Sequence, residues 1–414
     1  MSGNADNFFE WERFPSALKH QIVAGYLTEA FRVLLQHFKT DIVYADLFAG
    51  AGRYEDGRPG SPLIAADLAV KWSATGASTG VHCFNVEANP VFFNELQANT
   101  ASYPHGLVTN RLGRWQDHFG ELAQLMRGLP AIVFMDPFRL DVSLEAIADL
   151  VQQIGAEARD LILMFNIRGV QRIAHAKAAE DIERGGSVDL GGTPALPASN
   201  YFQRPNEVLG GRWWQELLLD GRLPEERFPD LVEGYCEQLR RIGSKDAKAA
   251  RRALAVPIPY KLGGSTSYYL VLVTRSPKAV VLFSDAADMA ISEAWRRREE
   301  EERLSRRPAE SFLPLFSEDE LPPLVESTYE LRRNPLIEQM RGEILEYVER
   351  ISWLSTIRDV HEMLAIRHCG LFREVHVHGL LRGLHDSGDI QLVPNRLRRF
   401  TRILPKSVVS KLHA

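Results

Sequence analysis

Tyr44-Ala-Asp-Leu-Phe-Ala-Gly-Ala-Gly-Arg53 is the stretch of sequence on which the predicted fold depends. A short apolar run, residues 42–44, leads into it, and a turn-rich segment, residues 56–62, precedes a helical run at residues 63–71. This order predicts a buried strand, a glycine-rich loop and a helix. Glycines let a ligand approach the backbone, and amides at a helix start favour polar ligand groups. The simpler alternative is a tight strand-to-helix turn that binds nothing.

A second apolar run with a carboxylate at its end follows at Val81-His-Cys-Phe-Asn-Val-Glu87. In a doubly wound sheet, ligands bind at the carboxyl ends of the strands, and an acidic residue ending the second strand can hold two ribose hydroxyls. A carboxylate accepts hydrogen bonds and donates none, so it suits a vicinal diol. The alternative is that Glu87 caps a helix or is solvated.

Further strands are predicted within residues 106–110, 131–138, 160–166, 253–259 and 267–274. The segment Ala131-Ile-Val-Phe-Met-Asp-Pro-Phe138 matters most, because it places Asp136 at the carboxyl end of a parallel strand, where the crevice lies. A helix cap or a buried hydrogen-bond acceptor is the alternative role for Asp136. The alternation of strands with helices predicts an α/β fold with a doubly wound, Rossmann-like sheet.

Together these motifs resemble those of class I S-adenosylmethionine-dependent methyltransferases. The dinucleotide-binding fingerprint G-x-G-x-x-G fits less well, because Glu55 stands where its last glycine would be. The resemblance implies a methyltransferase sheet with an antiparallel last strand and S-adenosylmethionine as the cofactor. Asp117 follows the third strand, where it would face the adenine amino group or cap a helix. The cofactor-binding candidates are Asp46, Phe48, Gly50, Gly52, Glu87 and Asp117.

Amine-methylating members of that class carry a [D/N/S]-P-P-[Y/F] motif after the fourth strand. There an acid or amide accepts hydrogen bonds from the target amine, and the aromatic ring stacks on a planar base. This chain has the shorter Asp136-Pro137-Phe138-Arg139, with one proline missing. By this resemblance Asp136, Pro137 and Phe138 are the catalytic candidates. The missing proline keeps open a fold that binds a partner without catalysing transfer.

A narrower resemblance is to the bacterial three-Cys-motif partner (TcmP) family, over about residues 16–290. It is carried by four strings in this order: Asp46-Leu-Phe-Ala-Gly-Ala-Gly52, Gly60-Ser-Pro-Leu-Ile-Ala65, Phe84-Asn-Val-Glu-Ala-Asn89 and Phe134-Met-Asp-Pro-Phe138. The family is methyltransferase-like and is associated with a separate protein that carries three cysteines. The resemblance therefore implies a possible three-Cys-motif partner protein, and it implies no particular substrate.

The composition fits a large globular chain. Its 414 residues are 45% hydrophobic, which predicts two or three domains, and the net charge of −5 does not by itself indicate a polyanion-binding protein. Cys83, Cys236 and Cys369 are far apart and lack C-x-x-C spacing, so we expect neither a disulfide framework nor a metal site. The polar start and the lack of a long apolar run predict a cytoplasmic protein without a membrane segment.

The expected domains are an N-terminal helical arm at residues 1–40, a methyltransferase-like domain at 41–305, a linker at 306–334 and a winged helix-turn-helix domain at 335–414. Within the arm, Ser16 is the expected N-cap of a helix that ends at Phe38. Lys19 and His20 either form a solvated turn, which we favour, or lie near the cofactor. An insertion near residues 169–230 contains a long small-residue loop, residues 185–197, with the character of a lid. We expect one of Trp213 and Trp214 near the substrate crevice.

The C-terminal region differs in charge from the rest of the chain. Residues 331–414 hold fourteen Lys and Arg against nine Asp and Glu, a net charge of +5, so the remainder carries −10. This asymmetry favours contact with a nucleic-acid backbone. The candidate residues, in or beside the wing, are Arg396, Arg398, Arg399 and Arg402. Winged helices also serve as protein-interaction modules, which is the alternative.

Two functions are therefore expected. The first is an S-adenosylmethionine-dependent methyltransferase that acts on a nucleic-acid nitrogen or oxygen. In that case Asp136 orients the nucleophile, Phe138 stacks on its ring, and in-line positioning is the main demand on the protein. The second is a methyltransferase-fold binding or scaffold protein without turnover. A methyltransferase that acts on a protein or a small molecule is a third interpretation, if the C-terminal region binds protein.

Overall fold

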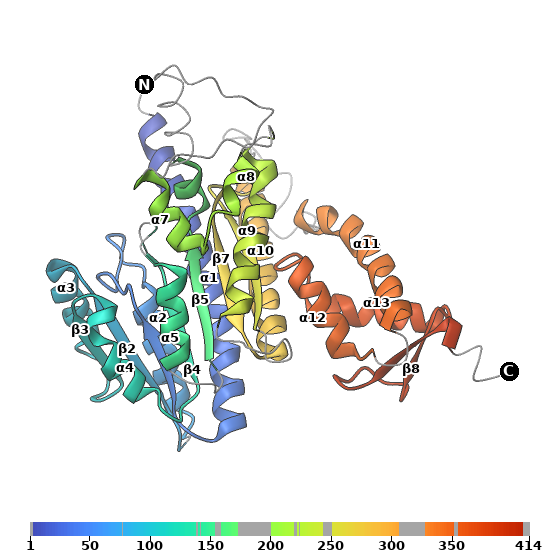
Figure 1. Cartoon of the computed structure of the whole chain (residues 1–414), viewed down its shortest axis with the longest axis horizontal. Coiled ribbons are helices and arrows are strands. Elements are labelled where there is room, and N and C mark those ends of the chain that lie inside the picture. The colour runs from blue at the N-terminus through green and yellow to red at the C-terminus, as the bar shows by residue number, and fades with distance from the viewer. Residues whose placement is uncertain are drawn as a thin grey trace, which may run out of the picture. The chain divides into compact units, whose positions relative to one another are not determined.

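The computed structural model of the chain describes residues 3–76, 78–137, 140, 142–153, 159–172, 200–218, 222, 224–242, 251–305, 328–351 and 355–408. The chain packs as two compact units, Met1–Ala279 and Val280–Ala414 (Figure 1). In the part of the chain that the structure describes, no helix combines the length and the apolar character needed to cross a bilayer.

The first unit is built on one seven-stranded sheet whose strand order is β3-β2-β1-β4-β5-β7-β6. Strands β1 to β5 pair in parallel, and β7 runs antiparallel to both of its neighbours. The strands are β1 (Ile42–Asp46), β2 (Val81–Glu87), β3 (Val108–Leu112), β4 (Ala131–Met135), β5 (Arg159–Phe165), β6 (Arg252–Pro259) and β7 (Thr266–Thr274). This is a Rossmann-like α/β sheet with an antiparallel strand inserted near one edge, as the sequence predicts.

Helices cover both faces of the sheet. Inward-pointing residues on one face of the strands pack with α4, α5 and α7 to α9 into a continuous apolar core. On the opposite face, α1 packs against α2, and the Phe31 ring on α1 meets the Tyr44 ring on β1. The helices are α1 (Gly3–Phe38), α2 (Ser61–Ser73), α3 (Pro90–Thr100), the 3-10 helix η1 (Trp115–His118), α4 (Phe119–Leu125), α5 (Leu144–Gln153), α7 (Asn200–Leu209), α8 (Trp214–Leu218) and α9 (Pro224–Arg241).

The N-terminal helix differs from the prediction. It begins at Gly3 and continues through Pro15, so the expected N-cap at Ser16 is wrong. Polar contacts hold α1 to the sheet: the Tyr26 hydroxyl donates to buried Asp160 on β5 (2.6 Å), and the Thr274 hydroxyl on β7 donates to the same carboxylate. The expected loop at residues 185–197 lies outside the described residues.

The second unit contains helices and a small antiparallel hairpin. Its elements are α10 (Pro277–Ser305), whose first three residues belong to the first unit, α11 (Thr328–Ile351), α12 (Ile357–Arg367), α13 (Glu374–Asp386), β8 (Ile390–Val393) and β9 (Arg402–Pro405). The boundary between the units therefore lies earlier than the predicted linker at 306–334. The strands β8 and β9 pair antiparallel, and the Ile357 amide at the start of α12 donates to the carbonyl of Thr401 before β9 (3.1 Å).

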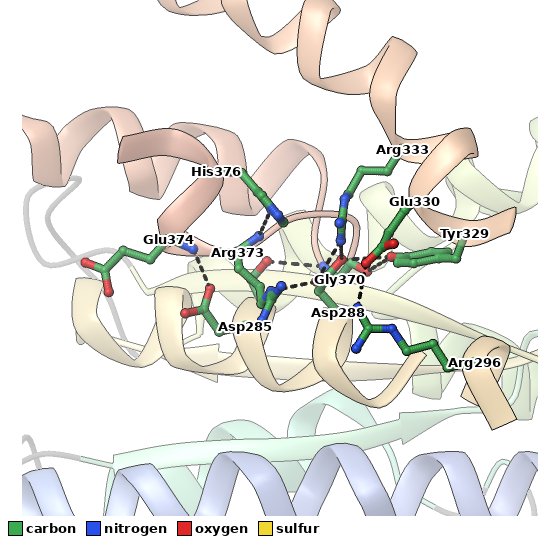
Figure 2. A network of polar contacts seen from close by, with 11 residues as sticks. Asp285, Asp288, Arg296, Tyr329, Glu330, Arg333, Gly370, Arg373, Glu374 and His376 are labelled. Atoms are coloured by element: carbon green, nitrogen blue, oxygen red, sulfur yellow. Dashed lines mark hydrogen bonds and ion pairs between the residues drawn. The ribbon is translucent and has the colours of Figure 1, made fainter. Parts of the chain in front are cut away.

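A buried carboxylate explains why α10 belongs to the second unit. Asp288 on α10 is fully buried and accepts hydrogen bonds from the Arg333 guanidinium (3.2 Å) and the Tyr329 hydroxyl (2.9 Å), both on α11 (Figure 2). Arg373 is the residue before α13, and its guanidinium lies 3.3 Å from the Asp288 carboxylate. Burial raises the pKa of Asp288, and the neighbouring arginines and Tyr329 oppose that shift. One carboxylate thus joins α10, α11 and the start of α13.

We expect replacement of Asp288 to destabilise the second unit strongly. Asp288→Ala leaves two arginines without their shared carboxylate, and removing one partner of a buried pair costs about 3–5 kcal/mol. Chemical denaturation of the full chain measures the loss, with the exposed Glu301→Gln on the same helix as the matched control. A loss no larger than the ~0.5 kcal/mol typical of surface substitutions would contradict this role.

Candidate functional site

The glycine loop after β1 is open on one side and packed on the other. Gly50 and Gly52 both have positive φ angles, 60° and 77°, which glycine adopts without strain. A side chain at Gly52 would meet Leu96 at 2.9 Å, whereas the space beside Gly50 is open. The Gly60 amide donates to the Gly52 carbonyl (2.8 Å) and closes the loop. The loop therefore offers a ligand access at Gly50.

Glu87, at the end of β2, connects the glycine loop after β1 to β2 through hydrogen bonds. Its carboxylate accepts one hydrogen bond from the Gly50 amide (2.8 Å) and another from the Asn89 amide (2.7 Å). Each carboxylate oxygen can accept more than one hydrogen bond, so acceptor capacity remains for a ligand. The two predicted motifs thus meet directly at the carboxyl edge of the sheet.

Asp46 and Phe48 lie beneath the loop rather than over it. Asp46 is fully buried and accepts a hydrogen bond from the Phe48 amide (3.2 Å). Burial raises the pKa of Asp46 to about 7, against the opposing effect of hydrogen bonds from Ser61 and Phe48. The Phe48 side chain packs against the core. Both residues shape the turn from within.

Asp117 acts as a cap in this structure. Its carboxylate accepts a hydrogen bond from the Arg114 amide (3.0 Å) at the start of η1, and the side chain is exposed. The neighbouring Gly113 amide donates to the Glu87 carbonyl (3.0 Å), so the β3–η1 turn adjoins the end of β2. The turn therefore brings Asp117 to the same edge as Glu87.

Asp136 forms a buried ion pair with Lys19 of α1. The Lys19 side chain is 6% exposed and the Asp136 side chain 18%. Burial alone would lower the pKa of Lys19. The Asp136 carboxylate, together with Tyr268 and Tyr54, raises this pKa by a larger amount, so the net pKa lies above its ordinary value. Lys19 is thus a buried ammonium, and the predicted solvated turn is wrong. Pro137 is buried beside Asp136, and the predicted Phe138 lies outside the described residues.

His20, next to Lys19, is also buried. Its imidazole meets the Tyr54 ring at 5.5 Å between centroids, in the segment that follows the glycine loop. Burial lowers the pKa of His20 well below its ordinary value, and the nearby Lys19 and Arg58 charges add to this effect. The imidazole is therefore neutral at neutral pH, and α1 supplies two polar side chains to this region.

A cavity of about 430 Å³ opens at the carboxyl end of β5. It is lined by Met164, Asn166, Arg168, Gln171, Arg172, Tyr260, Ser267 and Tyr268. The register pairs Met135 with Leu163, so Asp136, directly after β4, lies next to Met164 of β5. The Arg168 guanidinium lies over the Tyr260 ring (5.8 Å) and donates to the Thr266 carbonyl (2.8 Å).

The two tryptophans of the insertion have structural roles. Trp214 is fully buried and donates to the Asn206 side chain (3.0 Å). The Trp213 ring rests on Gly234, where an added side chain would come within 2.2 Å of it. Among the described residues that line the 430 Å³ cavity there is no tryptophan, so the expectation that one lies at the crevice is not met.

The predicted basic residues of the C-terminal region are exposed. Arg396, Arg398 and Arg399 lie on the loop between β8 and β9, and Arg402 begins β9. The same loop carries Phe400, which is 67% exposed. Guanidinium groups of Arg358 and Arg399 lie 5.7 Å and 5.4 Å from the Phe400 ring centroid. The loop therefore combines positive charge with an exposed aromatic ring.

Comparisons with known proteins give remote structural likenesses. No protein-family model matches the chain, and no curated protein matches it. A Legionella pneumophila protein of the family DUF519 is 12% identical, with a TM-score of 0.32, and the match covers 63% of this chain and 84% of that one. The O-methyltransferase TomG of Streptomyces achromogenes, solved with SAM, is 13% identical over 61% and 79%, with a TM-score of 0.31.

A third structure is an O-methyltransferase from Bacillus cereus, solved with SAH, at 12% identity and a TM-score of 0.30; the match covers 61% of this chain and 80% of that one. These scores are low, so the fold assignment rests on the strand order and directions of the sheet itself. The TcmP resemblance seen in the sequence receives no support from these matches.

Two site residues escape a reading of the sequence alone. Lys19 lies 117 positions from Asp136 along the chain, and no local spacing connects them. Tyr268, whose hydroxyl donates to the Pro15 carbonyl (2.9 Å), comes from β7 at the far end of the unit. No local signal in the sequence marks Lys19, because a lysine that follows an apolar residue of a helix can be either buried or solvated.

The buried Asp46 predicts a specific pH dependence of stability. Because its folded-state pKa is raised, the folded state favours the protonated carboxyl, and this contribution to stability is lost as pH rises from about 4 to about 7. Asp46→Asn mimics the protonated form. We therefore expect the thermal midpoint of the variant, relative to the parent chain, to be higher at pH 8 than at pH 5.

Thermal unfolding at the two pH values measures this difference, with Glu95→Gln, an exposed carboxylate on α3, as the control. Each pKa unit corresponds to about 1.4 kcal/mol, so the change over this window is measurable. An Asp46→Asn difference that stays constant between pH 5 and pH 8 would show that Asp46 does not titrate in this range.

Proposed function

We propose that the chain is an S-adenosylmethionine-dependent methyltransferase that acts on a nitrogen or oxygen of a nucleic acid. The observation that carries the proposal is the hydrogen bond between Glu87 and the Gly50 amide, beside open space at Gly50. It joins the glycine loop and the acidic strand end beside space that a ligand could enter. Strand ends of a doubly wound sheet are where such ligands bind.

The residues present fit this cofactor. The loop at Gly50 admits the backbone approach that its polar groups need, and Glu87 retains acceptors for the two ribose hydroxyls. Asp117, at the adjoining turn, would then be the residue that faces the adenine ring. When bound, the cofactor supplies an electrophilic methyl group carried by a sulfonium. The chain then has to hold a nucleophile in line with that group and exclude water from it.

Asp136 and Lys19 are the groups that would orient the nucleophile. The carboxylate of Asp136 accepts a hydrogen bond from an amine or hydroxyl, which aims a lone pair away from the carboxylate. The Lys19 ammonium offsets the carboxylate charge in this buried setting, and it fixes the carboxylate's orientation through their ion pair. A neutral base edge or sugar hydroxyl therefore suits this site better than a charged amine.

The neighbouring cavity has the size and lining for a nucleotide unit. Its volume of about 430 Å³ lies within the ~300–1,000 Å³ range of small-ligand sites. Tyr260 and Tyr268 offer aromatic rings, and guanidinium groups at Arg168 and Arg172 offer planar cations. Bases extruded from a strand stack on such groups. This lining, together with the basic C-terminal region, supports a nucleic acid as the proposed substrate.

The second unit would contribute nucleic-acid binding. Its helices α11, α12 and α13 followed by the β8–β9 hairpin have the order of a winged helix, with the exposed arginines on the wing. Helix α13, by contrast, carries Glu374 and Asp386 and only one arginine, Arg382. We therefore assign the contact to the wing, where phosphates meet the arginines and an unpaired base stacks on Phe400.

A non-catalytic scaffold is the second candidate. It is favoured by the missing proline of the Asp136-Pro137-Phe138 motif and by the fact that Asp136 already has a partner in Lys19. In that case the chain would serve a partner such as a three-Cys-motif protein, which the TcmP resemblance suggests. A methyl-transfer assay distinguishes it from the enzyme.

A pair of variants separates cofactor binding from transfer. Glu87→Ala should weaken S-adenosylmethionine binding by about 1.5–3 kcal/mol, the value of a hydrogen bond to a charged group. Asp136→Asn should leave that affinity within a few-fold and lower transfer by roughly 10²-fold or more, since an orienting acceptor is lost. Calorimetry and labelled-methyl transfer to cellular RNA and DNA measure the two effects, and each variant is the control for the other.

Unchanged affinity in a folded Glu87→Ala variant would remove Glu87 from the cofactor site. Tight cofactor binding by the parent chain without transfer to RNA, DNA or protein would favour the scaffold instead.

Binding by the wing makes a separate prediction, tested on the full chain. Replacing Arg396, Arg398 and Arg399 with Ala should flatten the salt dependence of nucleic-acid binding by up to about three units of logarithmic slope, because fewer counterions are released. Phe400→Ala should instead cost about 1–3 kcal/mol on single strands at an unchanged slope, since stacking involves no counterions. Fluorescence anisotropy from low to moderate salt measures both.

Lys278→Ala, which removes a positive charge at the start of α10, is the control for charge alone. Absence of salt-dependent binding, together with capture of a protein by the second unit, would make this unit a docking module.

A further inference from the structure

Two histidines and a glutamate converge in the second unit, and none of the three belongs to the proposed methyl-transfer site. His361 on α12 and Glu374 and His378 on α13 have ligand atoms that all lie within 4.8 Å of one another. His361 Nδ1 is 3.6 Å from Glu374 Oε1, and the two imidazole centroids are 5.1 Å apart. In the described part of the chain, this is the one group of three such side chains close enough to share an ion.

Helix geometry explains the convergence. Glu374 and His378 are four positions apart on α13, so their side chains lie on the same face. Glu374 stands at the first position of α13, where its amide donates to Asp285 on α10 (2.9 Å). Figure 2 shows its carboxylate directed away from Asp285 and from the Asp288 network. His361 is 4% exposed and faces this pair from α12.

We propose that His361, Glu374 and His378 form a binding site for a divalent transition-metal ion, with Zn²⁺ as the preferred ion. Imidazole nitrogens with one carboxylate oxygen suit zinc, which binds nitrogen at about 2.0–2.1 Å and oxygen at about 2.0–2.2 Å. Calcium and magnesium select oxygen ligands, so two imidazoles disfavour them. Three protein ligands leave a fourth position for water or for a ligand from outside the chain.

The three ligand atoms, which lie within 4.8 Å of one another, must draw closer to share an ion. Ligand atoms bonded to one tetrahedral zinc lie about 3.3 Å apart, as the bond lengths dictate. The His361–Glu374 distance of 3.6 Å is already near this value. Glu374 and His378 are half-buried, so their side chains can turn inward while the buried His361 stays in place. An ion held there would join α12 to the first turn of α13.

The site contains no cysteine, which is why the cysteine spacing in the sequence predicts no metal. It lies wholly in the second unit, so it does not depend on the proposed methyl transfer. The competing explanation is an ion pair between a protonated His361 and Glu374 that takes up no metal. Metal binding distinguishes the metal site from the ion pair, because an ion pair between His361 and Glu374 does not involve His378 and takes up no metal.

The test uses tag-free full-length protein stripped with a chelator and then titrated with Co²⁺, whose visible absorption reports a site of low coordination number. We expect one Co²⁺ per chain, displaced by Zn²⁺, and a higher thermal midpoint with Zn²⁺ because binding favours the folded state. His378→Gln and Glu374→Gln should each weaken binding more than tenfold. Both residues are half-buried, so these variants should fold, as circular dichroism would verify.

The control is His385→Gln, which removes another imidazole from α13 and should leave binding unchanged. Absence of stoichiometric Co²⁺ or Zn²⁺ binding to the parent chain would overturn the proposal in favour of the ion pair. Binding that survives in His378→Gln, or that is lost equally in His385→Gln, would also overturn it.

Discussion

The candidate site depends on one buried ion pair, that of Lys19 with Asp136. A buried ammonium is tolerated only beside a compensating charge, and here the carboxylate comes from the end of β4. The pair fixes the first helix against the carboxyl edge of the sheet, where the Glu87 carboxylate also binds the glycine loop. Without Lys19, Asp136 would be a partly buried carboxylate free to take other rotamers. The orientation of Asp136 is thus set by an element that precedes the whole sheet.

The strands of the sheet could be predicted because their signal is local. Apolar runs such as Ile42–Asp46 and Val81–Glu87 end in acidic residues, and the register of neighbouring strands brings these ends together. Lys19 could not be assigned, because its partner is far away in the chain and helical periodicity does not distinguish a buried lysine from a solvated one. The boundary between the two units could not be predicted from the sequence either. The charge-rich residues 291–306 indicate a solvated helix, whereas Asp288 on the same helix pairs with Arg333 and Arg373 of the second unit.

Each unit contains a buried carboxylate that is stabilised by hydrogen bonds from side chains distant in the sequence. In the first, the Asp160 carboxylate accepts hydrogen bonds from Tyr26 and Thr274, and in the second Asp288 accepts them from Tyr329 and Arg333. Each carboxylate joins elements distant in sequence, and each would be costly without its donors. These contacts specify the pairing of helices and strands, which apolar packing alone would leave less well defined.

The antiparallel insertion of β7 has a consequence for how the protein is made. This strand lies between β5 and β6 and supplies Tyr268, whose hydroxyl binds the carbonyl of Pro15 in α1. Within this unit, α1 is synthesised first and β7 nearly last. The Pro15 carbonyl of α1 therefore lacks its Tyr268 partner during most of the synthesis of the unit. Contacts so distant in sequence also slow folding. A truncated nascent chain that ends before β7 therefore exposes the β5 edge and leaves α1 incompletely anchored. Chaperone contact with the growing chain should accordingly persist until this strand has been added.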